Sequence, residues 1–206
     1  MRRALVLLCL GLFAATPTFA ADEPKAVIER LTNAVLAVLA DEGLSTADRR
    51  QRIEQLVYAD VDFDTLSRLV LARHWSEFTP AQQAEFITEF KKHLSLTYGK
   101  DLEGYHNERV TFLGDRQEAR GDWMVRTKIV RGGGPNDIQL DYRLRQSDGQ
   151  WKVIDFIIEQ VSLVANYRSQ FQAILSGRSP DDLIKMIREK SAKGETLKAP
   201  GAPAAK

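Results

Sequence analysis

The hydrophobic residues of this chain change their spacing at about residue 107 and change back at about residue 161. Before the first change, apolar side chains recur every three or four positions, which is typical of amphipathic helices. Between the two changes they alternate with polar side chains, which is typical of strands with one covered face. This order predicts an α+β fold, in which helices from both ends of the chain pack on one antiparallel sheet.

Capping signals delimit the expected helices. Pro24 at a first helical position, the capping pattern from Ser45 to Asp48 and the run Thr79-Pro80 are all typical helix starts. Glycines at 43, 99, 177 and 194 are typical helix ends. We therefore expect helices beginning near residues 24, 45, 63, 80, 161 and 180.

Four strands are expected in the central region, and they predict a curved four-stranded antiparallel sheet. The fourth, from Trp151 to Ile158, is apolar on both faces and should be the best-covered strand. In the first three strands one face is apolar and the other is more polar. The residues expected on the apolar faces are Val110 and Phe112, then Trp123, Val125, Thr127 and Ile129, then Ile138, Leu140, Tyr142 and Leu144.

The first twenty residues predict an export signal. Arg2 and Arg3 precede twelve small or apolar residues, 4–15, and Thr18 to Ala20 offers a cleavage site for signal peptidase. Twelve residues are too few to span a bilayer, which takes about 20. We expect a signal peptide at 1–20, one domain at 21–193 and a disordered tail at 194–206.

Removal of that signal peptide excludes several classes of function. Cys9, the only cysteine, leaves with it, so thiol chemistry and disulfides are excluded from the mature chain. Of 29 basic and 28 acidic residues, 27 and 28 remain, which gives a net charge of −1. This balance argues against nucleic acid as a partner.

Few residues have the setting that catalysis or metal binding requires. His74, His93 and His106 lack metal-ligand spacing, and Ser162 is better interpreted as a helix N-cap than as a nucleophile. We expect no metal and no cofactor. Asp155 lies among apolar residues of the fourth strand and could serve as a general base, or it could accept hydrogen bonds from an arginine or the backbone.

The chain also has more apolar residues than a small sheet and its helices obviously need. They could fill a large core, as in a structural adaptor, or they could surround a cavity for an apolar ligand. An enzyme resembling the isomerase-like or dehydratase-like proteins of similar cone shape, with Asp155 as base, is the alternative from another class.

Two stretches resemble the MlaC family, the periplasmic phospholipid shuttles that are also known as toluene-tolerance auxiliary proteins. The first runs from Val61 to Trp75 and continues through Thr79, Phe86, Phe90 and Leu94 to Tyr105; the second runs from Trp151 to Phe171. Ala72 and Gln160 stand where the family usually has glycine, which leaves the backbone bend at both positions open.

The resemblance implies a cone-like domain whose interior takes the acyl tails of a phospholipid. It also implies a periplasmic monomer without enzymatic activity, with an outer-membrane lipoprotein complex and an inner-membrane MCE-type ABC transporter complex as partners. From the periodicity we expect the cavity to be lined by Val70, Phe86, Phe90, Leu94, Tyr98, Val110, Phe112, Val125, Ile129, Tyr142, Leu144, Val153 and Ile157.

A basic patch is the expected docking surface for the partners. Arg126 and Lys128 alternate with the apolar residues of the second strand, as do Arg143 and Arg145 in the third. These four side chains should therefore share the outward face of the sheet. Because the mature chain has almost no net charge, docking should depend on such a local patch.

Overall fold

The computed structural model describes residues 23–99, 108–131, 137–195 and 197. The expected signal peptide therefore lies outside the described residues. The first elements are the helices α1 (Pro24–Ala40), α2 (Thr46–Asp60), α3 (Phe63–Leu71), the 3-10 helix η1 (Ala72–Glu77) and α4 (Pro80–Gly99). Then come β1 (Arg109–Gln117), the 3-10 turn η3 (Ala119–Gly121), β2 (Trp123–Val130), β3 (Ile138–Ser147), β4 (Gln150–Ile158), β5 (Val161–Ser162), α5 (Leu163–Leu175) and α6 (Pro180–Ala192). The expected α+β order is confirmed.

The helices begin where their capping residues predict. Ser45 and Ser162 accept hydrogen bonds from the backbone N–H groups of Asp48 and Ala165, which would otherwise lack a partner at the helix start. Ser179 forms a full capping box with Asp182 at the start of α6. Local sequence thus accounts for where these three helices begin.

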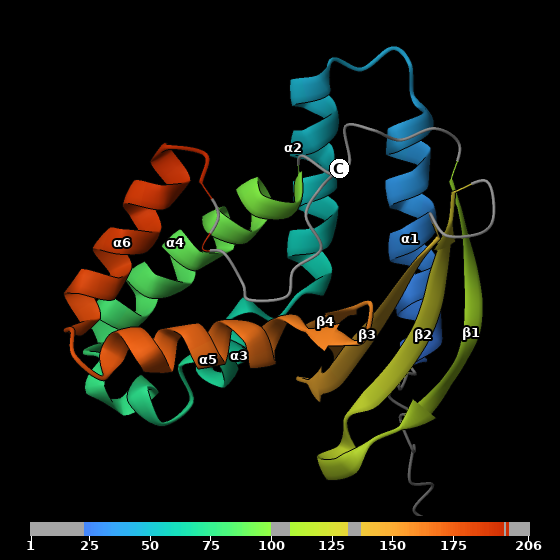
Figure 1. Cartoon of the computed structure of the whole chain (residues 1–206). Helices are drawn as coiled ribbons and strands as arrows, with labels where there is room; N and C mark the ends of the chain where they lie inside the picture. The colour runs from blue at the N-terminus through green and yellow to red at the C-terminus, as the bar shows by residue number, and fades with distance from the viewer. Residues whose placement is uncertain (1–22, 100–107, 132–136, 196, 198–206) are drawn as a thin grey trace, which may run out of the picture.

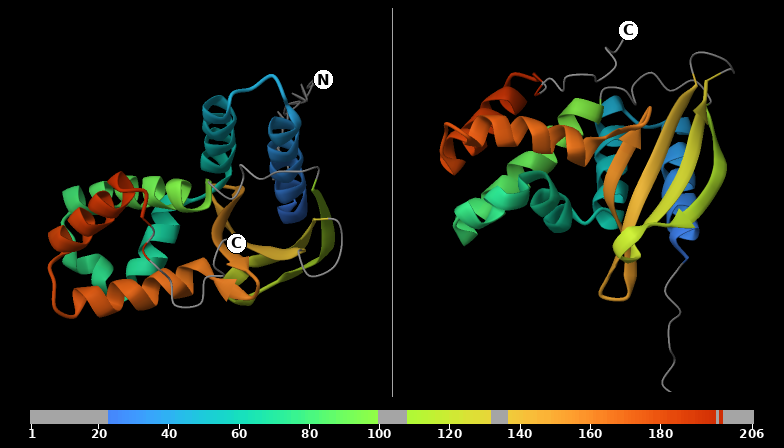
Figure 2. Two further views of the ribbon diagram at one scale, coloured as in Figure 1. Left: turned by 45° about the horizontal axis from the view of Figure 1, so that its top comes forward. Right: turned by 60° about the horizontal axis from the view of Figure 1, so that its bottom comes forward.

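The helices divide into two groups that lie on either side of β4 (Figure 1). Helices α1 and α2 lie against each other, and α1 lies along the curved sheet, while α3, α4, α5 and α6 pack together as a separate cluster (Figure 2). The core of this cluster is aromatic: Phe90 stacks on Phe86 at 5.4 Å between ring centroids and meets Tyr167 edge-on at 4.9 Å.

The sheet is antiparallel and follows chain order, β1-β2-β3-β4-β5. The fifth strand is a two-residue segment at the position where the sequence predicts the start of a helix. Ile129 pairs with Ile138, and Val125 pairs with Tyr142, so the apolar residues of β2 and β3 share one face. Their shared face is the concave one, which is covered by α1 (Figure 2).

A bulge in β4 corrects the face that we assigned to its second half. Arg143 pairs with Asp155 while Leu144 pairs with Val153, so Ile154 is an extra residue in the ladder. Beyond it the alternation is shifted by one position. Phe156 therefore lies on the concave face with Val153, and Ile157, which we expected there, lies on the opposite face.

The last described residues pack against the helical cluster. Leu197 is buried, and its backbone N–H donates to Nε2 of His93 at 3.3 Å. We expected a disordered tail from residue 194, but this contact extends the packed region beyond the predicted boundary at 193. Residues 196 and 198–206 of the expected tail lie outside the described part of the chain.

Candidate ligand-binding site

The space between α1 and the concave face of the sheet is closed at one end. Val27, Ile28 and Leu31 from the first half of α1 are buried. Val27 and Ile28 belong to the same core cluster as four buried residues of the sheet: Val125, Tyr142, Leu144 and Val153. Since these side chains have almost no exposed surface, this end is ordinary protein core.

The other end of the same face is apolar but only half-buried. Val35 and Val38 continue the face of α1 that carries Ile28 and Leu31, because seven residues make nearly two helical turns. Opposite them, at the end where β1 begins and β2 ends, lie further half-buried residues of the concave face (Figure 1). We call these residues the apolar zone: Val35, Val38, Val110, Ile129, Ile138 and Leu140.

Three hydroxyl groups lie at the border of the closed end with the apolar zone. Thr32 follows Leu31 on α1, and Thr127 and Tyr142 occupy the middle of β2 and β3. Burial raises the pKa of Tyr142 to about 12. The hydroxyl of Thr127 donates to the carbonyl oxygen of Leu140. This polar layer marks the depth at which the fully packed core begins.

The structure places most helical members of the expected lining elsewhere. Val70, Phe86 and Phe90 have no exposed surface, and Leu94 has 8%. Phe86 and Phe90 pack edge-on against Phe171 in the helical cluster, at 5.6 and 5.4 Å. Side chains with so little exposed surface offer almost no area to a ligand in this structure, so the apolar zone omits these four. Tyr98, near the end of α4, is half-buried.

The expected lining from the sheet is partly retained. Val110 and Ile129 lie in the apolar zone, and Phe112 lies beside it, half-buried against the core. Val125, Tyr142, Leu144 and Val153 share the face but belong to the closed end. The apolar zone also includes Ile138 and Leu140, which alternation placed on this face but which the expected lining did not contain. No sequence pattern indicated that Val35 and Val38 face the sheet, because the spacing of apolar residues does not say which helix covers a sheet.

The four cations of the expected basic patch share the convex face, but each is paired with a carboxylate. The pairing lowers the net charge of this face but leaves the side chains of Arg126 and Lys128 partly exposed. Arg145 is held most firmly, because two of its nitrogens donate to both oxygens of Asp122 at 2.7 and 2.9 Å. The other pairs are Arg126 with Asp141 at 3.8 Å, Lys128 with Asp137 at 2.9 Å and Arg143 with Asp155 at 3.3 Å.

Asp155 is a structural carboxylate. Its oxygens accept hydrogen bonds from the hydroxyl of Ser162 at 2.6 Å and from the backbone N–H of Val164 at 2.9 Å, as well as from Arg143. Burial raises its pKa, while these donors act in the opposite direction. The carboxylate thus anchors the start of α5 to β4 and fits the second interpretation that the sequence left open.

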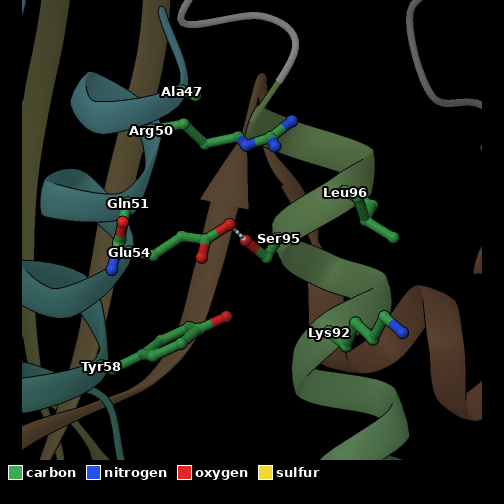
Figure 3. A pocket seen from close by; sticks show the side chains of 8 residues that line it. All are labelled: Ala47, Arg50, Gln51, Glu54, Tyr58, Lys92, Ser95 and Leu96. Atoms are coloured by element: carbon green, nitrogen blue, oxygen red, sulfur yellow. Dashed lines mark hydrogen bonds between the residues drawn. The ribbon is translucent and has the colours of Figure 1, made fainter. Parts of the chain in front are cut away.

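Two hollows lie between the groups of helices. One, of about 340 Å³, lies between α2 and α4 and is lined by Arg50, Glu54, Tyr58 and Ser95 among others (Figure 3). The second, of about 660 Å³, includes Tyr58, Lys91 and Lys152. Both are lined largely by polar side chains, so neither is the apolar cavity that we expected.

The described residues hold neither a metal-binding cluster nor a membrane-spanning helix. This part of the chain contains no group of three or more His, Cys, Asp or Glu side chains arranged to hold a metal ion. None of its helices has the length and apolar character needed to cross a bilayer.

The concave face of the sheet is thus packed at one end and leaves half-buried apolar side chains at the other, where an apolar ligand would find a surface to contact. The family model for the MlaC protein matches residues 29–189. The chain therefore belongs to the MlaC family, whose members are periplasmic, non-enzymatic lipid carriers.

Individual relatives agree with this assignment. The chain is 28% identical to the toluene tolerance protein ttg2D of Pseudomonas putida, over 91% of this chain and 87% of that protein. It is 21% identical to the intermembrane phospholipid transport system binding protein MlaC of Haemophilus influenzae, over 68% and 66%. A phospholipid-binding protein from Ralstonia solanacearum, solved in complex with a phospholipid, superposes with a TM-score of 0.76 at 27% identity, over 84% of this chain and 99% of that chain.

Proposed function

We propose that this protein carries phospholipid between membranes and holds the acyl chains in the apolar zone between α1 and the concave face of the sheet. The observation that carries this proposal is the row of half-buried apolar side chains facing α1, which no described residue covers fully. Two acyl chains of about 15 methylenes each would expose surface worth roughly 24 kcal/mol in water, at about 0.8 kcal/mol per methylene. A carrier must cover that surface.

The remaining parts of the proposal concern location and partners. Residues 1–20 would direct export to the periplasm and be cleaved. An outer-membrane lipoprotein complex and an inner-membrane MCE-type ABC transporter complex would exchange lipid with the protein. The convex face stays a candidate docking surface, with Arg126 and Lys128 as its more exposed cations, at 42% and 44% of the side chain. Because zone and bilayer are both apolar, the exchange can be nearly neutral in free energy.

The direct experiment is organic extraction of protein purified from an envelope fraction, followed by lipid mass spectrometry. We expect phospholipid in stoichiometric amount. Protein stripped of lipid should also take phospholipid up from vesicles. Protein that carries no phospholipid and takes none up would contradict the proposal.

A pair of variants locates the acyl chains. Ile129 and Val130 are neighbours on β2, both half-buried, and they lie on opposite faces of the sheet. Ile129→Trp should fill the apolar zone and lower phospholipid loading about fivefold or more, while the matched variant Val130→Trp should load normally. Lipid per protein after vesicle exchange measures this. Equal loading by both variants, or an equal loss in both, would place the acyl chains elsewhere.

A further inference from the structure

Beyond α6 the chain reverses its direction. Gly194 has a positive φ of 65°, and its N–H donates to the carbonyl oxygen of Ser191 at 3.1 Å. The N–H of Glu195 donates to the carbonyl oxygen of Lys190 at 2.9 Å. These two bonds form a Schellman motif, which ends a helix and turns the chain back. We call the described residues that follow α6, 194, 195 and 197, the strap.

The strap returns to the interface between α4 and α6, which lie against each other (Figure 1). Leu197 is 6% exposed and belongs to the main hydrophobic cluster. Its backbone N–H donates to Nε2 of His93 on α4 at 3.3 Å. Nδ1 of the same ring lies 3.2 Å from the hydroxyl of Ser191 on α6. One buried imidazole therefore joins the strap to both helices.

The bond between the strap and His93 requires a neutral ring. Nε2 accepts the N–H of Leu197 only while it carries no proton, because both nitrogens of a protonated imidazole are donors. A protonated ring in the closed structure would also be a buried charge. Burial and the positive charge of Lys190 oppose that charge and lower the pKa of His93 to about 4.

The groups that face the ring do not favour a cation. On α6, Lys190 carries a positive charge, and it lies 3.4 Å from the carboxylate of Glu195 in the strap. From α5, Tyr167 packs edge-on at 6.0 Å, and burial raises the pKa of its phenol, so the phenol stays neutral. Protonation of His93 therefore requires water at the ring. The strap is the cover that can leave most easily, because chain ends open at a lower free energy than the core.

We propose that the strap is a proton-sensitive latch, which a neutral His93 holds closed and which leaves the helical cluster when that ring takes up a proton. The open form binds the proton more tightly than the closed form, so acid raises the open population. The latch lies in the cluster of α4, α5 and α6, whereas the apolar zone lies between α1 and the sheet. It therefore does not depend on the proposed carrier function.

Amide hydrogen exchange of the full mature chain tests the latch. After correction for the intrinsic effect of pH on exchange, the N–H of Leu197 should lose protection about tenfold or more between pH 7 and pH 5. Protection of Val125, inside the sheet, should not change. In His93→Gln the side-chain oxygen can still accept the N–H but does not titrate, so protection should be equal at both pH values. His74→Gln, which removes another buried histidine, should behave like the unaltered protein.

Three results would overturn the proposal. One is unchanged protection of Leu197 at pH 5. The second is an equal loss at Val125, which would mean that the whole domain unfolds. The third is the same loss in His93→Gln as in the unaltered protein, which would assign the pH dependence to another group.

A second measurement decides the matter if His93→Gln does not hold the strap at pH 7. Because proton uptake and strap opening are linked, loosening the strap must raise the pKa of the His93 ring. Leu197→Ala should raise that pKa, measured by NMR titration, by about one pH unit. The matched variant Leu113→Ala, at an exposed leucine on β1, should leave it unchanged. No rise in Leu197→Ala would contradict the latch.

Discussion

Ala72 and Gln160 adopt backbone angles that normally belong to glycine. Ala72, at the junction of α3 and η1, has φ 50° and ψ −119°, and Gln160, in the turn between β4 and β5, has φ 67°. The resemblance stated from the sequence implied glycine at both positions, which left open whether the backbone bends there without it. Both bends are present, which means that the surrounding packing imposes them against the preference of a residue with a Cβ atom.

The strain at Ala72 predicts a stabilising substitution. A residue with a Cβ atom destabilises the folded state by about 1–2 kcal/mol when its φ is positive. Glycine removes this strain, but fixing its more flexible backbone on folding costs up to about 1 kcal/mol in entropy. Ala72→Gly should therefore raise the free energy of unfolding by about 1 kcal/mol, as measured by urea denaturation. Ala37→Gly, at an exposed position inside α1, should lower it by a similar amount. A decrease for both variants would show that Ala72 is not strained.

Two arginines of the convex face, which alternation predicts to be exposed cations, are instead partners in ion pairs with buried carboxylates. Asp122 and Asp155 are 4% and 2% exposed, and Arg145 and Arg143 are their partners. Removing one partner of a buried pair leaves an uncompensated charge. Charge reversal at Arg143 or Arg145 would therefore damage the fold, so docking is better tested at Arg126 and Lys128, whose side chains are more exposed.

At the scale of elements, the contact between α4 and α6 depends on a buried histidine. His93 is fully buried, its Nδ1 lies 3.2 Å from the hydroxyl of Ser191 on α6, and its Nε2 accepts the N–H of Leu197. Tyr167 of α5 packs edge-on against its ring at 6.0 Å. Burial, followed by the positive charge of Lys190, lowers the pKa of His93 to about 4.

This pKa predicts a specific pH dependence. The unfolded chain takes up a proton near pH 6.5, while the folded protein resists protonation down to about pH 4. The contribution of His93 to stability is therefore present above pH 6.5 and is lost as the pH falls towards 4, by up to about 3 kcal/mol. We expect His93→Gln to reduce the slope of the unfolding free energy over this range. An unchanged slope would contradict the prediction.

For the whole molecule, one end of the α1–sheet interface is core and the other is half-exposed. Such a fold should gain stability from its ligand, because the ligand binds the folded state alone. At a free lipid concentration of 100 times Kd the gain is about 2.7 kcal/mol. Stripping the lipid should lower Tm and increase the binding of an apolar dye, and re-addition should reverse both. In Ile129→Trp, the change in Tm on adding lipid should be smaller than in the unaltered protein. If Tm of the unaltered protein does not change on adding lipid, the lipid is not held inside the fold.

The sequence by itself determined the order of elements, their capped ends, the inward faces of β2 and β3 and the family. These properties depend on neighbouring residues: an N-cap bonds three residues ahead, and alternation along a strand is a property of that strand. The two family motifs are likewise contiguous runs of residues.

Tertiary structure alone decided which apolar residues are core and which remain available to a ligand. Phe86, Phe90 and Leu94 have the same periodicity whether they face a cavity or other aromatic rings, and only packing with Tyr167 and Phe171 tells the two apart. The extra residue Ile154 moved Ile157 to the other face, because a bulge is visible only when both strands are aligned. The carboxylate partner of each convex-face cation was likewise decided by tertiary structure, because alternation along one strand does not show which residues lie beside it in space.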